Sequence, residues 1–393
     1  PLAFSIACFP LHHEQTSLEL QLTGKALNNA VEWTLGGYYF DAAGTMRGAI
    51  DPYVYGRWTI NDDVTDSNKS AFAHVVVHPT DRLSVTGGLR WSKTRKSYSF
   101  DHPGLLVVPT PVVGEMTRVD WKLGADFKLT DDLMVYGQAA TGFRPPGVNP
   151  RPTTAIQLLP FDAEEMISYE VGLKSEFFDK RVRLNLAGFY SDYKKRLTSV
   201  LRYECTGLTT PVDLPAQCGT RPFVQWFIFE TAPATVKGFE AELTATPVDG
   251  LTINGAVGYN RFENGVKTPG QPGYRNPDQL IQPEWNVNGG IQYEMPLAGG
   301  TLTPRLDWFY QTEMTFGPST TSPKTDLFTV PAYSVFNGRI GFETGDKAWK
   351  LELSATNLFN KFYYYNLFSG SGFALSGQPS RPREWAITAR RKF

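Results

Sequence analysis

Along most of its length, this chain of 393 residues alternates apolar and polar residues one by one. Between positions 118 and 129, for example, Val119, Trp121 and Leu123 fall on one side of an extended chain. Asp120 and Lys122 fall on the other side. Because a β-strand turns successive side chains to opposite faces, this segment presents one apolar and one charged face. The period predicts strands whose two faces meet different surroundings.

About fifteen such segments follow one another, with hardly any helical periodicity between them. The composition is 41% hydrophobic with a mean hydropathy of −0.28, and no uninterrupted apolar run of about twenty residues is present, which argues against membrane-spanning helices. The net charge of −1 comes without a basic stripe, so nucleic acid is not an expected partner. Together, the alternating segments predict an all-β antiparallel protein. The strands of a soluble all-β domain also alternate, so such a domain stays open as an alternative.

The connections between the segments are short and long in turn. Seven short turns rich in Asp, Gly, Asn and Pro are expected at 26–29, 79–81, 130–132, 178–181, 248–250, 297–300 and 344–347. Seven long connections are expected at 41–66, 100–115, 145–162, 203–222, 264–281, 316–332 and 366–382. Tight turns at one end and large loops at the other are typical of a transmembrane β-barrel of the outer membrane. The aromatic residues, 13% of the chain, gather near segment ends as in the girdles of such barrels.

Strand direction gives an expectation about the chain as a whole. Short turns should face the periplasm, so the last segment, 383–393, runs inward and ends there. Counting back gives an odd number of strands, whereas a single-chain bacterial barrel has an even number. We therefore expect strands upstream of the first clear one, 17–24, and interpret the chain as the C-terminal part of a longer protein. The expected organisation is an unassigned segment, 1–13, followed by a partial barrel, 14–393.

Several motifs then carry a resemblance to a known family. They are ATGFRPPGVNP (140–150), SYEVGLKSEFFDKRVRLNLAGFYSDYKK (168–195), ATVKGFEAELTATP (234–247), SATNLFNKFYY (354–364) and REWAITARRKF (383–393). In order and spacing they resemble the barrel of TonB-dependent outer-membrane receptors, from about residue 15 onward. The resemblance implies a 22-stranded barrel in the outer membrane of Gram-negative type, of which about 15 strands are expected here. No segment resembles the plug domain or the TonB box, so TonB would act only through a plug that this sequence lacks.

The resemblance implies a transporter and not an enzyme, with outer-membrane lipid around it. The expected ligand is a ferric siderophore or another nutrient, and cobalamin and carbohydrate substrates stay open. A passive porin is the first alternative, and an outer-membrane enzyme or adhesin is the second. No catalytic residue, metal site or cofactor is expected, because the five histidines lack the spacing of zinc ligands and no nucleophile elbow is recognisable.

By the same resemblance, ligand recognition is expected in the external loops and on the upper wall. The candidate residues are Arg144, Asn149, Arg151, Tyr203, Trp226, Tyr363, Tyr364 and Tyr365. Arginines beside aromatic rings suit an anionic chelate or a sugar, through charge-assisted hydrogen bonds and stacking. The alternative is that these rings belong only to the outer girdle.

Two further features concern cysteines and the last residue. Cys205 and Cys218 lie in one expected external loop, where an oxidising compartment favours a disulfide worth about 3 kcal/mol on the chain-entropy estimate. Two free thiols are the alternative, and Cys8 has no expected partner. Phe393, with Trp385 on the same face, resembles the aromatic-ended last strand that the barrel-assembly machinery recognises.

Overall fold

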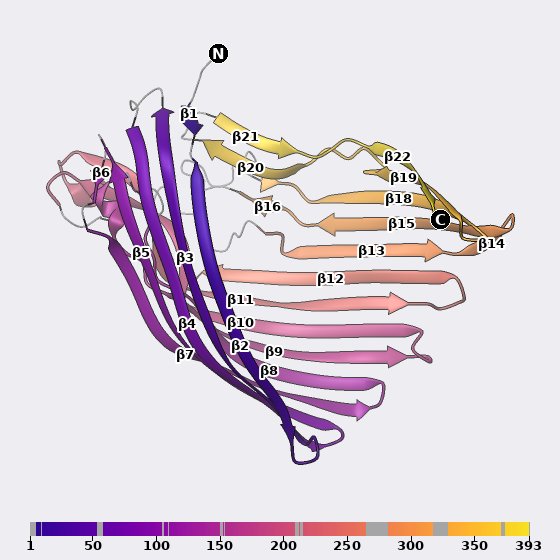
Figure 1. Cartoon of the computed structure of the whole chain (residues 1–393). Coiled ribbons are helices and arrows are strands. Elements are labelled where there is room, and N and C mark those ends of the chain that lie inside the picture. The colour runs from indigo at the N-terminus through magenta and orange to yellow at the C-terminus, as the bar shows by residue number, and fades with distance from the viewer. Residues whose placement is uncertain are drawn as a thin grey trace.

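The fold is a single antiparallel sheet that curls into an incomplete barrel (Figure 1). The computed structural model describes residues 5–8, 10–52, 58–103, 106–108, 110–149, 152, 154–208, 212, 215–264, 282–316, 329–370 and 374–392. The main sheet has 18 strands, of which β1, β6 and β14 are short pieces on the edge of a longer neighbour. The other fifteen pair in chain order, which confirms the expected all-β meander.

The strands of this wall are β2 (Leu11–Ala26), β3 (Val31–Pro52), β4 (Trp58–Thr80), β5 (Leu83–His102), β7 (Val112–Thr130), β8 (Leu133–Arg144), β9 (Glu164–Phe177), β10 (Val182–Cys205), β11 (Phe223–Ala245), β12 (Leu251–Asn264), β13 (Trp285–Tyr293), β15 (Gly300–Gln311), β18 (Tyr333–Thr344), β19 (Trp349–Thr356) and β22 (Glu384–Arg391). The short strands are β1 (Ser5–Cys8), β6 (Leu106–Val107), β14 (Met295–Leu297), β16 (Met314–Thr315), β17 (Thr329–Val330), β20 (Tyr364–Gly370) and β21 (Ala374–Pro379). Two single turns of 3-10 helix complete the described elements, η1 (Ala155–Leu158) and η2 (Pro215–Cys218).

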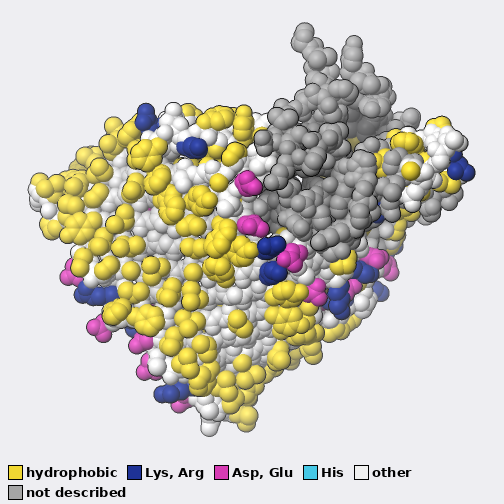
Figure 2. Space-filling model, turned by 180° about the vertical axis from the view of Figure 1, so that it is seen from behind, with side chains coloured by type: hydrophobic (Ala, Val, Ile, Leu, Met, Phe, Trp, Pro, Cys, Tyr) yellow, Lys and Arg dark blue, Asp and Glu magenta, His cyan; other side chains and the backbone are white. Residues whose placement is uncertain are grey.

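The convex face of the sheet is apolar, as the alternation predicts. Leu89, Val119, Leu123 and Val171 are each more than half exposed although they lie in the middle of long strands. Figure 2, taken from the side opposite to Figure 1, shows hydrophobic side chains over most of the visible face. In water such a surface would be very costly, whereas the hydrocarbon core of a membrane accepts it.

All seven expected short turns occur at one end of the sheet. The β9–β10 turn has Phe178, Asp179 and Lys180 in the left-handed region, with φ between 54° and 65°. Gly250, at φ 82° in the β11–β12 turn, lies so close to the carbonyl oxygen of Glu294 that a Cβ atom there would be 2.4 Å from it. Only glycine fits that close approach.

At the other end, two expected long connections are wrong in part. Within 41–66, β3 continues to Pro52 and β4 begins at Trp58, and the two are paired up to Ile50 and Trp58. Within 100–115, β5 continues to His102 and β7 begins at Val112. Above the membrane both faces meet water, so the ladder continues while the alternation that marks a lipid-facing strand disappears.

Part of segment 1–13, for which the sequence pattern predicts no element, is also strand. Leu11 to His13 begin β2, and β1 pairs with the outer end of β3 through Ser5 and Pro52. Ser5–Cys8 reads Ser-Ile-Ala-Cys and Leu11 is followed by two histidines, so this region lacks the strict alternation that marks a lipid-facing strand. Within the described ranges, no helix has the length and apolar content needed to cross a membrane.

The concave face holds aromatic rings that lie flat over glycines. A Cβ atom on Gly172 would be 2.4 Å from the ring of Tyr136, and one on Gly36 would be 2.2 Å from the ring of Phe72. Each ring therefore fills the space that a side chain on the neighbouring strand would need.

Candidate functional site: the inner wall and its outer end

The inner wall carries the charged half of the alternating pattern. The guanidinium carbon of Arg90 on β5 lies 5.7 Å from the ring centroid of Tyr38 and 5.5 Å from that of Phe72. Farther round the wall, Arg305 on β15 donates to Asp307 at 2.6 Å and to Asn254 at 3.0 Å. Such contacts give a polar face that suits water or a polar partner, in contrast to the convex side.

A depression of about 290 Å³ lies lower on this wall, between β5 and β9. Its lining includes two basic and two acidic side chains, Lys122, Lys174, Asp126 and Glu170. The Lys174 ammonium lies 5.6 Å from the ring centroid of Tyr136. Because the charges balance, this depression does not favour a ligand of either sign.

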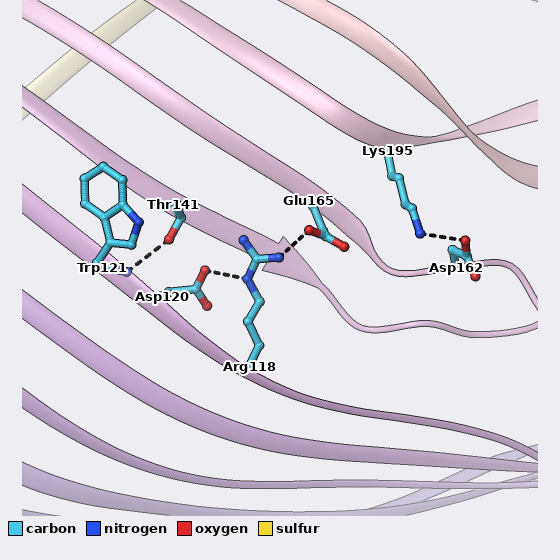
Figure 3. Close-up of polar contacts among 7 residues, drawn as sticks. All are labelled: Arg118, Asp120, Trp121, Thr141, Asp162, Glu165 and Lys195. Atoms are coloured by element: carbon cyan, nitrogen blue, oxygen red, sulfur yellow. Dashed lines mark hydrogen bonds and ion pairs between the residues drawn. The ribbon is translucent and has the colours of Figure 1, made fainter.

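Arg118 links β7 to β9 near the outer end of the wall. Its Nε atom donates to Asp120 Oδ1 at 2.8 Å, and its Nη1 atom lies 2.6 Å from Glu165 Oε2 of β9 (Figure 3). The side chains of Arg118 and Asp120 are only 17% and 12% exposed, so solvent screens this pair weakly. The bridge from β7 to β9 passes the end of β8, where the backbone N–H of Trp121 donates to Thr141 Oγ1 at 3.0 Å.

Lys195 and Asp162 form a second ion pair in the same view, with 2.8 Å between Nζ and Oδ2 (Figure 3). Lys195 lies thirteen positions beyond Val182, the first residue of β10, which is roughly 33 Å in height at the usual strand rise and tilt and so above the apolar band. The hydrogen bond to Asp162 raises the pKa of Lys195. Both side chains are largely exposed, so the pair adds little stability.

The segment between β8 and β9 crosses the outer end of the wall and is fixed on both sides. On one side, Nδ1 of the fully buried His102 lies 2.9 Å from the carbonyl oxygen of Pro152, and its Nε2 lies 2.8 Å from Asp62 Oδ1. On the other side, Asn149 Oδ1 accepts from the backbone N–H of Phe229 on β11 at 2.6 Å, while Nδ2 donates to a carbonyl of its own segment. The structure thus places the candidate Asn149, 4% exposed, where it holds this segment against β11.

The connection between β10 and β11 contains a disulfide. Cys205 and Cys218 are joined with an S–S distance of 2.02 Å, and both are buried. The candidate Tyr203 packs against them and meets Phe223 edge to face, with 5.5 Å between ring centroids. Tyr203 is 4% exposed, so its ring belongs to the small core of this connection.

The three consecutive tyrosines divide between two faces. Tyr363 stacks on Tyr333 with 4.0 Å between centroids and 16° between planes, and Tyr365 meets Tyr363 at 5.2 Å. Tyr364 instead packs on Phe362 at 5.1 Å. Burial, with a smaller effect of the neighbouring Tyr365 hydroxyl, raises the pKa of Tyr363 well above its ordinary value. We call Tyr333, Tyr363 and Tyr365 the tyrosine cluster.

Two residues of this region, Tyr333 and Gln311, cannot be singled out from the sequence pattern alone. Tyr333 is the first residue of β18 and lies opposite Gln311, the last residue of β15. Gln311 is 6% exposed, and its Nε2 atom makes no hydrogen bond within the part of the chain that the structure describes. Phe309 and Met314 pack beside Tyr333. The one hint in the sequence is that Phe309 and Gln311 end an alternating segment on its inward side.

The remaining candidates lie apart from this cluster. Arg144 ends β8, opposite Glu164, and its side chain is exposed. Arg151, Phe393 and the side chain of Trp226 lie outside the described residues. Among the residues that are described, no three His, Cys, Asp or Glu side chains are grouped so that they could hold a metal ion.

Comparison with known proteins agrees with this architecture. Residues 11–358 match the family model described as TonB dependent receptor-like, β-barrel. The pesticin receptor of Yersinia pestis is 30% identical over 374 residues, which cover 94% of this chain and 51% of that protein. The ferripyoverdine receptor of Pseudomonas aeruginosa is 23% identical over 319 residues, covering 80% of this chain and 35% of that protein.

Solved structures give the same fold. The ferric yersiniabactin uptake receptor of Yersinia pestis superimposes with a TM-score of 0.77 at 22% identity, over 100% of this chain and 56% of that one. The ferric-catecholate import receptor of Escherichia coli K12 gives 0.73 at 16% identity, over 98% and 55%. The chain thus spans about half the length of the relatives it matches. It belongs to the β-barrel family of TonB-dependent receptors, which lie in the Gram-negative outer membrane.

Proposed function

We propose that this chain forms the wall of a receptor that takes up a ferric siderophore or a similar iron chelate. Several similar proteins are named for such ligands, namely ferripyoverdine, ferric yersiniabactin and ferric catecholates. In this proposal the outer end of the wall binds the chelate. Uptake then depends on a plug domain and on TonB.

The observation that carries the proposal is the tyrosine cluster at the outer end of the inner wall. Stacked rings offer flat apolar surface, and phenol hydroxyls offer hydrogen bonds, which suits the aromatic and oxygen-bearing groups of an iron chelate. The Nε2 atom of Gln311, which makes no hydrogen bond to any residue that the structure describes, adds a buried donor opposite Tyr333 in the strand register. A donor left without a partner at such a depth is costly, and a ligand oxygen would relieve that cost.

Basic groups lie at the same end of the wall. Arg144 is exposed where β8 ends, and the guanidinium carbon of Arg196 lies 4.4 Å from the ring centroid of Phe262. A cation against a ring can also bond a carboxylate or phenolate of an anionic chelate. Asn149 and Tyr203 would then act by holding the loops around the ligand, as their buried contacts indicate.

Binding to the full chain, folded in detergent, tests the proposal. Ferric yersiniabactin, ferric pyoverdine and ferric citrate are titrated against tryptophan fluorescence, with cobalamin and a maltodextrin as iron-free comparisons. At least one ferric chelate should bind, and Tyr363→Ala should weaken it about tenfold, as the loss of one stacking partner implies. Tyr364→Ala is the matched control because its ring lies on the other face.

Two outcomes would contradict the proposal. One is tighter binding of cobalamin or maltodextrin than of every ferric chelate. The other is an equal effect of the Tyr363→Ala and Tyr364→Ala substitutions, since the cluster would then have no special part in binding.

A further inference from the structure

Strand register locates the outer boundary of the lipid-facing band on β2 to β7, which lie side by side in Figure 1. One row of outward positions across these strands is entirely apolar or glycine: Leu20, Gly37, Ala71, Trp91 and Val119. The next row toward the outer end is Leu18, Tyr39, Lys69, Lys93 and Thr117. The row after that is polar throughout: Thr16, Asp41, Ser67, Arg95 and Glu115. Lys69 and Lys93 therefore stand where hydrocarbon gives way to headgroups.

The height of Lys93 agrees with this boundary. Lys93 follows Leu83, the first residue of β5 at the short-turn end, by about ten residues, or about 33 Å along a strand. A tilt of about 40° reduces this to about 25 Å, which is the height of the apolar band in such barrels. Both lysines are exposed, so their ammonium groups can reach the headgroup layer.

The two lysines are directly opposite each other on β4 and β5, an arrangement that repels. Among the described residues, neither has an ion-pair partner. Arg95, in the row above, is 2.6 Å from Glu115 and so occupies that carboxylate. The other carboxylate nearby on the outer face is Asp41, one row above Lys69. Among the residues that the structure describes, the three cations Lys69, Lys93 and Arg95 thus outnumber the two carboxylates around them on the outer face.

A second pair of facing cations, on the same outer face, has its repulsion relieved by a neighbouring carboxylate. Lys237 and Arg261 are also directly opposite each other, on β11 and β12. Glu263, two positions beyond Arg261, lies 2.9 Å from Lys237 Nζ and 3.2 Å from Arg261 Nε. On β5 the corresponding position, two residues beyond Lys93, holds Arg95. A cation there replaces the compensating anion.

We infer that Lys69, Lys93 and Arg95 form a binding site for a phosphate group of the lipid around the barrel. The partner is lipid A of the outer leaflet, because the site lies at the end opposite the short periplasmic turns and at headgroup depth. Two ammonium groups and a guanidinium that line a membrane surface recognise such phosphates through charge, and Tyr39 beside Lys69 offers a ring at the interface. The phosphate supplies the negative charge that Glu263 supplies on β12.

Native mass spectrometry of the full chain in detergent tests this inference, with bisphosphorylated lipid A as the probe. The wild-type chain should retain this lipid, and Lys69→Gln/Lys93→Gln should bind it about 30-fold more weakly, as two basic contacts at a membrane surface imply. Lipid A stripped of its phosphates should bind both proteins alike. Lys237→Gln is the matched control, because that lysine already has Glu263 as its partner. Equal retention by the wild-type and double-variant chains would overturn the inference.

A measurement on the wild-type chain covers the case in which the double variant does not fold. Reductive methylation of lysines, located by peptide mass spectrometry, reports which amines are covered. Bisphosphorylated lipid A should protect Lys69 and Lys93 while Lys122 on the inner wall stays reactive. If inorganic phosphate alone protects the two lysines equally, the site takes free phosphate and the lipid assignment is wrong. Absence of any protection would also contradict it.

Discussion

A charge placed in the middle of the convex face should destabilise the folded chain strongly. On β7 the outward apolar positions run from Val119 to Leu129, and Leu123 lies at the centre of that span with 58% of its surface exposed. Leu123→Arg therefore puts a guanidinium close to the bilayer midplane. For barrels of this kind an arginine at that depth costs about 2 to 4 kcal/mol of folding free energy.

The matched control places the same charge on the concave face. Asn185 on β10 is flanked by Lys174 and Glu242 in register, so an added cation meets one charge of each sign. Asn185→Arg should change the free energy of unfolding by no more than about 0.5 kcal/mol, as is usual for substitutions at a wet surface.

Urea unfolding of the full chain in phosphatidylcholine vesicles, followed by tryptophan fluorescence, measures both variants. The free energy of unfolding should fall strongly for Leu123→Arg and hardly at all for Asn185→Arg. If both variants lose the same stability, or if Leu123→Arg loses none, the convex face does not meet hydrocarbon.

Three further predictions concern the outer end. Arg118→Gln should cost about 1 to 3 kcal/mol in the same unfolding assay because it leaves two poorly hydrated carboxylates without their cation, and an unchanged midpoint would contradict the bridge. Cys205→Ser/Cys218→Ser should lose about 3 kcal/mol of local stability and open the β10–β11 connection to proteases. Equal cleavage of the wild-type and double-variant chains would contradict a stabilising role of the disulfide. The folded-state pKa of Tyr363 is raised, so its stabilising effect is complete below the ordinary tyrosine value near 10 and is lost as the pH rises through the folded-state value. Absorbance at 295 nm should therefore show that Tyr363→Phe removes one of the late-titrating phenols.

The membrane-spanning wall could be predicted because one physical rule acts on every strand there. On β7, lipid on one side and a polar interior on the other impose strict alternation from Val119 to Leu129, which is readable without any knowledge of neighbours. The short turns were equally predictable, since a tight reversal needs residues such as Gly250 that tolerate the required backbone.

The outer end was less predictable because lipid no longer covers one face of the strands there. Strands β3 and β4 continue far into the region expected to be a loop, where both faces meet water and no alternation is imposed. Ladder hydrogen bonds hold these extensions, and almost any residue can supply them.

The candidate site depended on contacts between segments that are distant in sequence. Tyr363 and Tyr365 could be singled out as aromatic residues. The stacking of Tyr363 on Tyr333, and the edge contact of Tyr365 with Tyr363, follow from how β18 and the segment leading into β20 are arranged. In the same way, nothing in the sequence near Asn149 shows that its amide is hydrogen-bonded to β11.

Spin labelling along β7 tests most directly whether lipid covers the convex face. Single nitroxides at positions 118 to 129 of the full chain in vesicles would be probed with oxygen, which partitions into lipid, and with a water-soluble nickel complex. If lipid covers the convex face, oxygen accessibility should be high at Val119, Trp121 and Leu123, and nickel accessibility should be high at Asp120 and Lys122. Equal accessibility of odd and even positions to the two reagents would contradict it.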